Sequence, residues 1–278
     1  MRFAVPFILF ACFASFGAVA SDLDTALRQS YVSCVGISDM LNDVKKLAGV
    51  NTAVTGVGTV AGGGAVIAGV AKKNLMNKLR KIEDESETDN IAYNDIAITW
   101  RTDFKPNSKS KAKKLGNWRT GLLAVNTATN VAGAVIAGKN AHNEDLENRI
   151  KECSQVIDEL KDAIVRAKYE DIDTSEANAI YDACSGYKYV DLSVLTKRAK
   201  GAEISSIIGG SAGAVGVITS AVANKSSGEK ERKLDTASNV LAGGATVLTG
   251  TATVFNATQI AAAKKIISIA EQCEGLLK

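Results

Sequence analysis

The sequence predicts an all-α protein formed by tandem duplication of a helical hairpin, with four glycine-rich central helices and disulfide-braced helical extensions. Two observations support this fold class. Four stretches between charged segments carry no charged side chain: residues 50–71, 120–138, 204–224 and 236–263. A cysteine-containing hexapeptide that begins at Tyr31 returns in similar form at Tyr181, and a second cysteine closes each unit. A repeat of this kind predicts architecture but names no chemistry.

The N-terminus has the features of a secretory signal peptide. Arg2 precedes an apolar run over residues 3–16, and small residues lead to a cleavage position after Ala20. The alternative is a lipoprotein signal in which Cys12 is acylated, but Phe10 is bulky where a small residue is normal. The apolar run is too short to serve as a spanning helix. We therefore expect residues 1–20 to be removed and the mature chain to be exported.

Removal of the signal peptide leaves an even number of cysteines, which in an exported chain indicates disulfides. They are Cys34, Cys153, Cys184 and Cys273. Four cysteines allow three pairings, and the repeat favours Cys34 with Cys153 and Cys184 with Cys273. The sequences around Cys34 and Cys153 place apolar residues at near-heptad spacing, so each cysteine lies on a seam where two helices meet. The alternative is that these are small buried hydrophobic residues without a bond.

The repeat divides the mature chain into two units. The first, residues 21–168, contains a helical hairpin with a long basic loop at 72–119. The second, residues 169–278, contains a hairpin with a short loop at 225–235.

Each uncharged stretch is long enough to cross a hydrocarbon core of about 30 Å as a helix. Small residues recur in it every four positions, a spacing that lets helix backbones approach closely. These stripes are Ala61, Ala65 and Gly69; Ala124, Ala128 and Ala132; Ser205, Gly209 and Gly213; and Ser238, Ala242, Thr246 and Gly250. The glycines that we expect at helix contacts are Gly58, Gly62, Gly69, Gly133, Gly209, Gly213, Gly216, Gly243 and Gly250.

Two other interpretations of the uncharged stretches remain open. In a water-soluble bundle, the asparagines and threonines would form a mild polar face; the asparagines are Asn51, Asn126, Asn130, Asn239 and Asn256. Antiparallel strands are suggested by Thr-rich runs such as residues 249–254, but a strand crosses a membrane with only about 9–11 residues. Solvated helices normally carry Lys and Glu on one side, so the absence of charge favours the membrane.

Loop charge predicts a topology for the membrane interpretation. Residues 72–119 and 225–235 are rich in Lys and Arg, whereas Asp and Glu exceed Lys and Arg over residues 140–203. The positive-inside rule therefore places both basic loops in the cytoplasm and the connection between the hairpins outside. All four mature cysteines then lie on the exported side, in the membrane of the cell envelope. A secreted or periplasmic soluble protein is the alternative localisation.

The sequence offers no catalytic, metal-binding or cofactor-binding motif. His142 is the single histidine, and no CxxC or CxxH spacing occurs. We expect no enzyme activity, no cofactor, no metal, no nucleic-acid partner and no small-molecule substrate. The expected partners are the lipid bilayer and either further copies of the chain or a membrane complex. The expected role is structural, scaffolding or self-assembling; the alternative is an exported soluble protein whose glycine-rich hairpins insert into a target membrane and form a pore.

Overall fold

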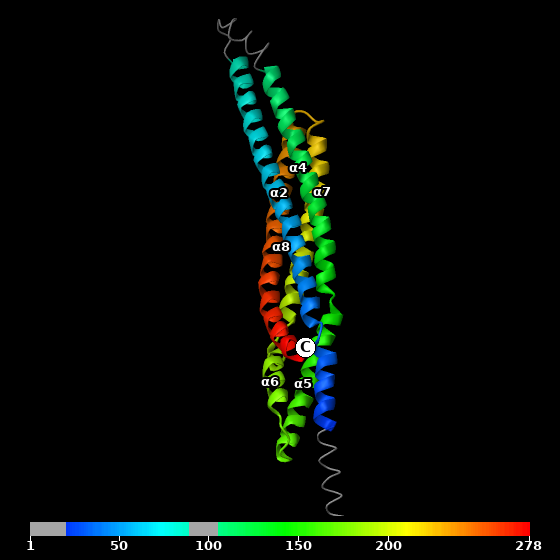
Figure 1. Ribbon diagram of the computed structural model, residues 1–278. Coiled ribbons are helices and arrows are strands. Elements are labelled where there is room, and N and C mark those ends of the chain that lie inside the picture. The colour runs from blue at the N-terminus through cyan, green and yellow to red at the C-terminus, as the bar shows by residue number, and fades with distance from the viewer. Residues whose placement is uncertain (1–20, 89–104) are drawn as a thin grey trace, which may run out of the picture. The chain divides into compact units, whose positions relative to one another are not determined.

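The computed structural model describes residues 21–88 and 105–278, which are helical apart from short connections. After helical residues 21–34, the elements are α2 (Ile37–Thr88), α4 (Lys105–Ala141), α5 (Glu144–Tyr169), α6 (Ser175–Cys184), the 3₁₀ helix η2 (Ser185–Tyr189), α7 (Ser193–Ala223) and α8 (Gly228–Leu277) (Figure 1). The all-α fold of long helices packed in hairpin-like pairs is therefore confirmed. The predicted signal peptide lies outside the described residues, and the tandem duplication stays a prediction.

The described chain forms two compact units. Unit 1 contains residues 21–48, 139–197 and 258–278, and unit 2 contains residues 49–138 and 198–257. Each of the two predicted repeats contributes residues to both units. The unit boundaries at residues 48/49, 138/139, 197/198 and 257/258 fall within helices.

Helix α5 of unit 1 has the end signals of a stable surface helix. The side chain of Asn143 accepts a hydrogen bond from the Leu146 amide at the N-terminus. The first turn carries Glu144 and Asp145, and the last turn carries Lys168, so the charges at both ends complement the helix dipole. Its apolar side is buried, with Cys153 and its heptad neighbours in the core of unit 1.

A glycine breaks the first helical segment from α2. Gly36 has φ of 92°, a left-handed conformation that side chains rarely adopt. The carboxylate of Glu274 on α8 is buried there and accepts hydrogen bonds from the amides of Gly36 (3.2 Å) and Ser38 (2.8 Å). A carboxylate at this position satisfies the free amides that begin α2 and complements the helix dipole.

The core of unit 1 is apolar and crossed by two disulfides. Cys34 is bonded to Cys153 and Cys184 to Cys273, the pairing that the sequence predicts. All four sulfurs belong to one buried cluster of leucine, isoleucine and alanine side chains. Tyr187 of η2 joins this cluster, and burial, with a smaller effect from the charge of Glu274, raises the pKa of its hydroxyl.

Two helix starts in unit 1 are held by aspartates. Asp173 accepts a hydrogen bond from the Ser175 amide at 2.9 Å, and Asp191 accepts one from the Ser193 amide at 2.9 Å. In both cases the bonds to the serine lower the pKa of the carboxyl group, because they stabilise its charged form. Each aspartate lies two residues before the first residue of its helix, and its bond satisfies a free amide at the start of α6 or α7.

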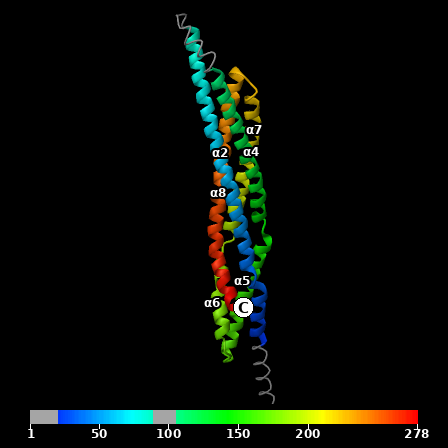
Figure 2. The same ribbon diagram turned by 45° about the horizontal axis from the view of Figure 1, so that its top comes forward.

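Unit 2 is a bundle of four helical segments taken from α2, α4, α7 and α8. In Figures 1 and 2 the four segments lie side by side, and both views show α7 returning into α8 through a short turn. Neighbours in the chain run antiparallel. Residues 49, 138, 198 and 257, where the chain enters or leaves unit 2, therefore lie at one end of the bundle.

The helices extend further into the connections than the expected loops allow. Helix α2 continues to Thr88 and α4 begins at Lys105, within the basic loop expected at 72–119; α8 likewise begins at Gly228, within the loop expected at 225–235. Leu79 and Ala112 are 2% and 3% exposed, so heptad packing continues beyond the uncharged stretches. The end of an uncharged stretch is thus not the end of a helix.

The disulfides predict a large loss of stability on removal. Cys34→Ser with Cys153→Ser should lower the free energy of unfolding of unit 1 by about 4–5 kcal/mol, since the bond closes a separation of 119 residues. Denaturant unfolding followed by circular dichroism measures the change. Peptide mapping of the parent protein without reductant should recover both linkages. Recovery of Cys34 joined to Cys184 would contradict the structure.

Candidate functional site

The interior of unit 2 follows a heptad pattern. Along all four helices, buried positions recur at alternating spacings of three and four residues, and Ala61, Ala68, Ser205 and Gly210 are buried beside them. This 3.5-residue period is that of a left-handed coiled coil, in which one face of each helix stays in the core over its whole length. The positions are 51, 55, 58, 62, 65, 69 and 72 on α2; 112, 116, 119, 123, 126, 130, 133 and 137 on α4; 199, 202, 206, 209, 213, 216, 220 and 223 on α7; and 235, 238, 242, 245, 249, 252 and 256 on α8.

The residues at these positions are mainly small or polar. Glycine, alanine, serine, threonine and asparagine occupy most of them, and Leu123 is the one large aliphatic side chain among them. Apolar clusters in the described part of unit 2 are correspondingly small, with Ala65, Leu123 and Ala242 in one and Ala137, Ala202 and Ala252 in another. A core of this composition brings helix backbones close together but removes little apolar surface from water.

Asparagines and threonines form hydrogen bonds across the bundle. Asn51 on α2 donates to Asn256 on α8 at 3.1 Å. Asn130 on α4 donates to the Thr249 hydroxyl at 2.7 Å, and that hydroxyl lies 2.9 Å from the side-chain oxygen Oδ1 of Asn126. The exposed fraction of each of these five residues is 0–1%. Buried amides with specific partners fix the register in which the helices pack.

The burial of these asparagines removes one argument for the water-soluble interpretation. That interpretation places Asn51, Asn126, Asn130 and Asn256 on a solvated face, but in the structure their exposed fraction is 0–1%. The physical reason is their heptad position, which turns them toward the other helices. The asparagines are core residues of unit 2.

Six of the nine candidate packing glycines make close helix contacts. A Cβ atom added at five of them would lie within 3.0 Å of a side chain on another helix, closer than real contacts allow, and one added at Gly209 would lie at a tight 3.1 Å. Gly58 faces Thr129, Gly62 faces Thr246, Gly69 faces Asn239, Gly133 faces Thr55, Gly209 faces Asn130 and Gly213 faces Thr127. Gly216 and Gly250 have ordinary contact distances of 3.5 Å and 3.8 Å. Gly243 has nothing within 4 Å, so the structure does not bring it into a contact.

The stripe expected at Ala124, Ala128 and Ala132 faces outward, because all three residues are exposed. A strict four-residue spacing advances by more than one helical turn at each step, so it drifts off the packing face. The alternating spacing through Leu123, Asn126 and Asn130 stays on it. The expectation of close packing along the alanine stripe was therefore wrong in register.

The outer surface of unit 2 is apolar. β-branched aliphatic side chains project from all four helices; the most exposed are Val60 (77%), Ile67 (71%), Val240 (71%), Val247 (69%), Ile218 (64%), Val254 (62%) and Val135 (60%). Exposed large aliphatic residues scattered singly are normal for any protein. Here they cover the same helices whose buried faces hold the asparagines, which inverts the usual distribution of polar and apolar side chains.

A buried cluster of charges closes one end of the uncharged interior. The Lys72 ammonium lies 2.9 Å from Asp235 and 3.1 Å from Glu231. The Arg119 guanidinium contacts the other oxygen of Asp235 at 2.5 Å and donates to Ser220 at 2.9 Å. Lys72 and Arg119 are 2% and 0% exposed. Breaking a buried ion pair leaves an uncompensated charge, so the cluster ties α2, α4 and α8 together at this end.

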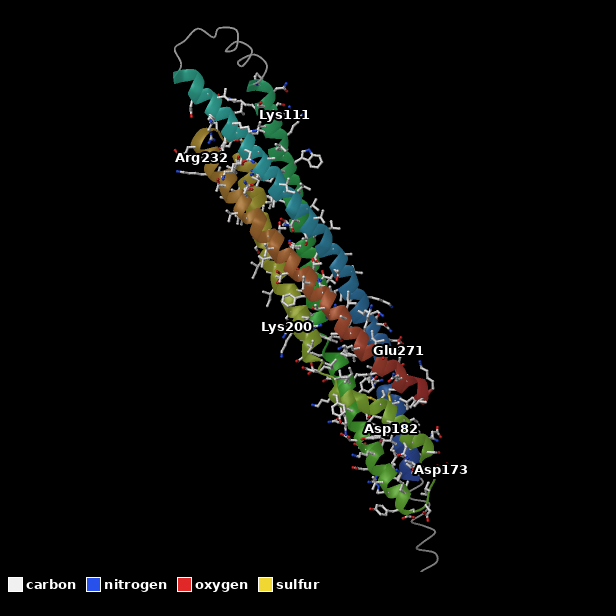
Figure 3. All side chains as sticks on the ribbon, turned by 90° about the vertical axis from the view of Figure 1, so that its left-hand side faces the viewer. Lys111, Asp173, Asp182, Lys200, Arg232 and Glu271 are labelled. Carbon is white, nitrogen blue, oxygen red and sulfur yellow. A yellow bond between two sulfur atoms is a disulfide. The ribbon has the colours of Figure 1, made fainter. Side chains whose placement is uncertain are left out.

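The charged side chains of unit 2 gather at its two ends. Figure 3 shows Lys111 and Arg232 toward one end and Lys200 toward the other. Between Arg119 and Gly138, α4 rises roughly 30 Å without a charge, at about 1.5 Å per residue, which matches a hydrocarbon core. In the described chain, four helices are long and apolar enough to cross a membrane.

Among residues 21–88 and 105–278, no group of three or more His, Cys, Asp or Glu side chains is arranged to hold a metal ion. The candidate functional feature is the bundle itself, with its polar interior, apolar exterior and charged end. Comparisons with protein families, with curated proteins and with solved structures find no match.

Sequence reasoning missed the charge cluster, although a signal for it was present. Lys72, Arg119 and Asp235 each stand next to an uncharged stretch. Each also continues the three-and-four spacing of the buried positions on its helix. A charge in heptad register at the edge of an uncharged stretch therefore indicates a buried ion pair, whereas one out of register is solvated.

Glycine substitutions test the close packing of unit 2. Gly213→Leu places a side chain where a Cβ alone would lie 2.5 Å from the Thr127 hydroxyl, so it should lower the free energy of unfolding by about 1–3 kcal/mol. The matched control is Gly243→Leu, which adds the same side chain where nothing lies within 4 Å. Thermal unfolding of the two purified variants in detergent measures the difference. Equal melting temperatures would show that Gly213 has no packing role.

Removal of one charge tests the buried cluster. Asp235→Asn leaves Arg119 without its only ionic partner in the described residues, and it should lower the free energy of unfolding by about 3–5 kcal/mol. Glu229→Gln is the control on the same helix, because its pair with Lys233 is exposed and should contribute about 0–1 kcal/mol. Denaturant unfolding in detergent compares the two. A similar small effect for both variants would contradict the structural role of the cluster.

Proposed function

We propose that unit 2 is an integral membrane bundle that anchors the disulfide-braced unit 1 on the exported side of a cell-envelope membrane. The observation that supports this proposal is the inverted distribution of side chains, with asparagines and threonines inside and valines and isoleucines outside. In water, each exposed aliphatic side chain forgoes roughly 1.5–3 kcal/mol of burial. In hydrocarbon that penalty disappears, and polar side chains face the interior of the bundle instead.

The polar interior fits the same solvent. Helices in lipid gain no hydrophobic driving force from contact with each other, so they associate through small residues and interhelical hydrogen bonds. Unit 2 uses both: glycine contacts such as Gly62 against Thr246, and amide bonds such as Asn51 to Asn256. A solvated bundle of this length would need a larger apolar core than the three-residue clusters found here.

Three independent features support the proposed orientation. The N-terminal sequence resembles a signal peptide, the basic segments lie at the end of unit 2 that carries Lys72 and Arg119, and the disulfides belong to unit 1. Disulfides persist in oxidising compartments, and positive charge is retained on the cytoplasmic side. Unit 1 then lies outside and the buried charge cluster lies near the cytoplasmic surface.

The proposed role is structural and non-enzymatic. The small-residue faces on which self-association would depend are consumed by packing within the chain, as the contacts of Gly58, Gly133 and Gly213 indicate. Association with other copies or with a membrane complex therefore uses the valine-covered outer faces in the membrane or the polar surface of unit 1. The bundle serves as the anchor and unit 1 as the part presented to partners.

Extraction and proteolysis test this proposal. Alkaline carbonate should leave the protein in the membrane pellet of cells that express it. A protease added to the outside of intact spheroplasts should cut within residues 140–203 and spare residues 72–119. Release by carbonate would contradict constitutive spanning and favour the alternative, an exported soluble protein whose hairpins insert later. Cleavage in both regions would contradict the proposed orientation.

A further inference from the structure

The strongest unassigned site is a cavity at the charged end of unit 2. It has a volume of about 320 Å³ and lies between α2, α4 and the turn that joins α7 to α8. Its basic lining comes from Lys72, Arg80, Lys109 and Lys113, and its apolar lining from Met76, Leu79 and Ala112. That volume is at the lower end of the range for small-molecule sites. We propose that this cavity binds a phosphate group.

The charges around the cavity leave an excess of positive groups. Four basic side chains and two carboxylates, Glu83 and Glu231, line it. Glu231 is paired with Lys72, at 3.1 Å. Arg80, Lys109 and Lys113 take part in no ion pair within the described residues. Lysine and arginine together are the usual phosphate ligands, arginine through paired donors and lysine as a point charge.

Lys72 gives the site a fixed floor. Its side chain is 2% exposed, and its ammonium is held by Asp235, Glu231 and Asn224 at 2.9–3.2 Å. Asn224 and Gly228 also line the cavity, so the turn before α8 faces the same space. Gly228 has φ of 67°, and the chain enters α8 there, where the first backbone N–H groups of the helix have no partner within the helix. The cavity is thus lined by α2, the first turns of α4 and the turn before α8, and it combines the buried Lys72 with three basic side chains that are more exposed.

The position of the cavity favours a lipid as the source of the phosphate. Lys113 precedes Arg119 by six residues, or roughly 9 Å of helix. With Arg119 at the edge of the hydrocarbon core, Lys113 lies at the outer boundary of the headgroup layer, which is about 5–8 Å thick on each side. The apolar side chains of Met76 and Leu79 suit the glycerol and first acyl carbons of a lipid. The choice of a lipid source rests on the proposed function, whereas the phosphate site itself does not.

Binding measurements on the full chain test the inference. The purified protein with intact disulfides is titrated in neutral detergent with short-chain phosphatidylglycerol, short-chain phosphatidylcholine and inorganic phosphate, each by calorimetry. The pocket variant is Arg80→Gln with Lys113→Gln. The control variant is Lys73→Gln with Lys114→Gln, which removes the same charge from the same two helices at exposed positions outside the cavity. Circular dichroism and disulfide mapping verify that both variants are folded.

The parent protein should bind phosphatidylglycerol, and the pocket variant should bind it at least about tenfold more weakly, since each Lys or Arg near a surface contributes about 1 kcal/mol. The control variant should stay within about twofold. Binding of inorganic phosphate with the same dependence on the variants supports the site and assigns a soluble source. Equal weakening in both variants, no effect in either, or no binding of any phosphate-bearing probe overturns the inference. Binding of phosphate is measured independently of carbonate extraction, so failure of the phosphate site and failure of the proposed membrane anchor can be told apart.

Discussion

The close approach of four helices through small residues is the constraint on which unit 2 depends. The closest glycine contacts, such as Gly62 against Thr246 or Gly213 against Thr127, leave no room for a Cβ beside the side chain of the facing helix. Because small side chains occupy the heptad face, the β-branched valines and isoleucines lie on the outer face of the bundle. The apolar exterior is therefore a consequence of the packing mode, and it is favourable where the surrounding medium is hydrocarbon.

The same constraint explains why polar groups cluster inside. Helices this close bring Asn130 within 2.7 Å of Thr249, and at the end of the bundle they bring Arg119 within 2.5 Å of Asp235. These contacts add direction to an interface that van der Waals packing alone would leave free to slide. Unit 1 is stabilised differently, by a leucine- and isoleucine-rich core and two disulfides. The two units thus carry opposite packing chemistries on shared helices.

Much of the fold could be predicted from the sequence because its signals are local. Charge-free stretches indicated the four long helices, and the paired cysteines indicated the bonds from Cys34 and Cys184. The packing register could not be predicted from spacing by four, since Ala128 satisfies that pattern and faces outward. Contacts across the bundle, such as Lys72 with Asp235, depend on how antiparallel helices align. That alignment is a tertiary property. The heptad pattern that indicates it is hard to recognise in the sequence, because its positions hold residues of very different polarity.

The most direct test of the central claim is to measure whether water or hydrocarbon surrounds the outer face of α4. Spin labels placed singly at Val131 and Val135, with the native disulfides closed, report whether oxygen or a polar nickel chelate reaches them in liposomes. The inverted bundle predicts high oxygen and low chelate accessibility at both positions, because both side chains are exposed on the uncharged stretch. High chelate accessibility at both positions would mean that the outer face lies in water, and it would contradict the account.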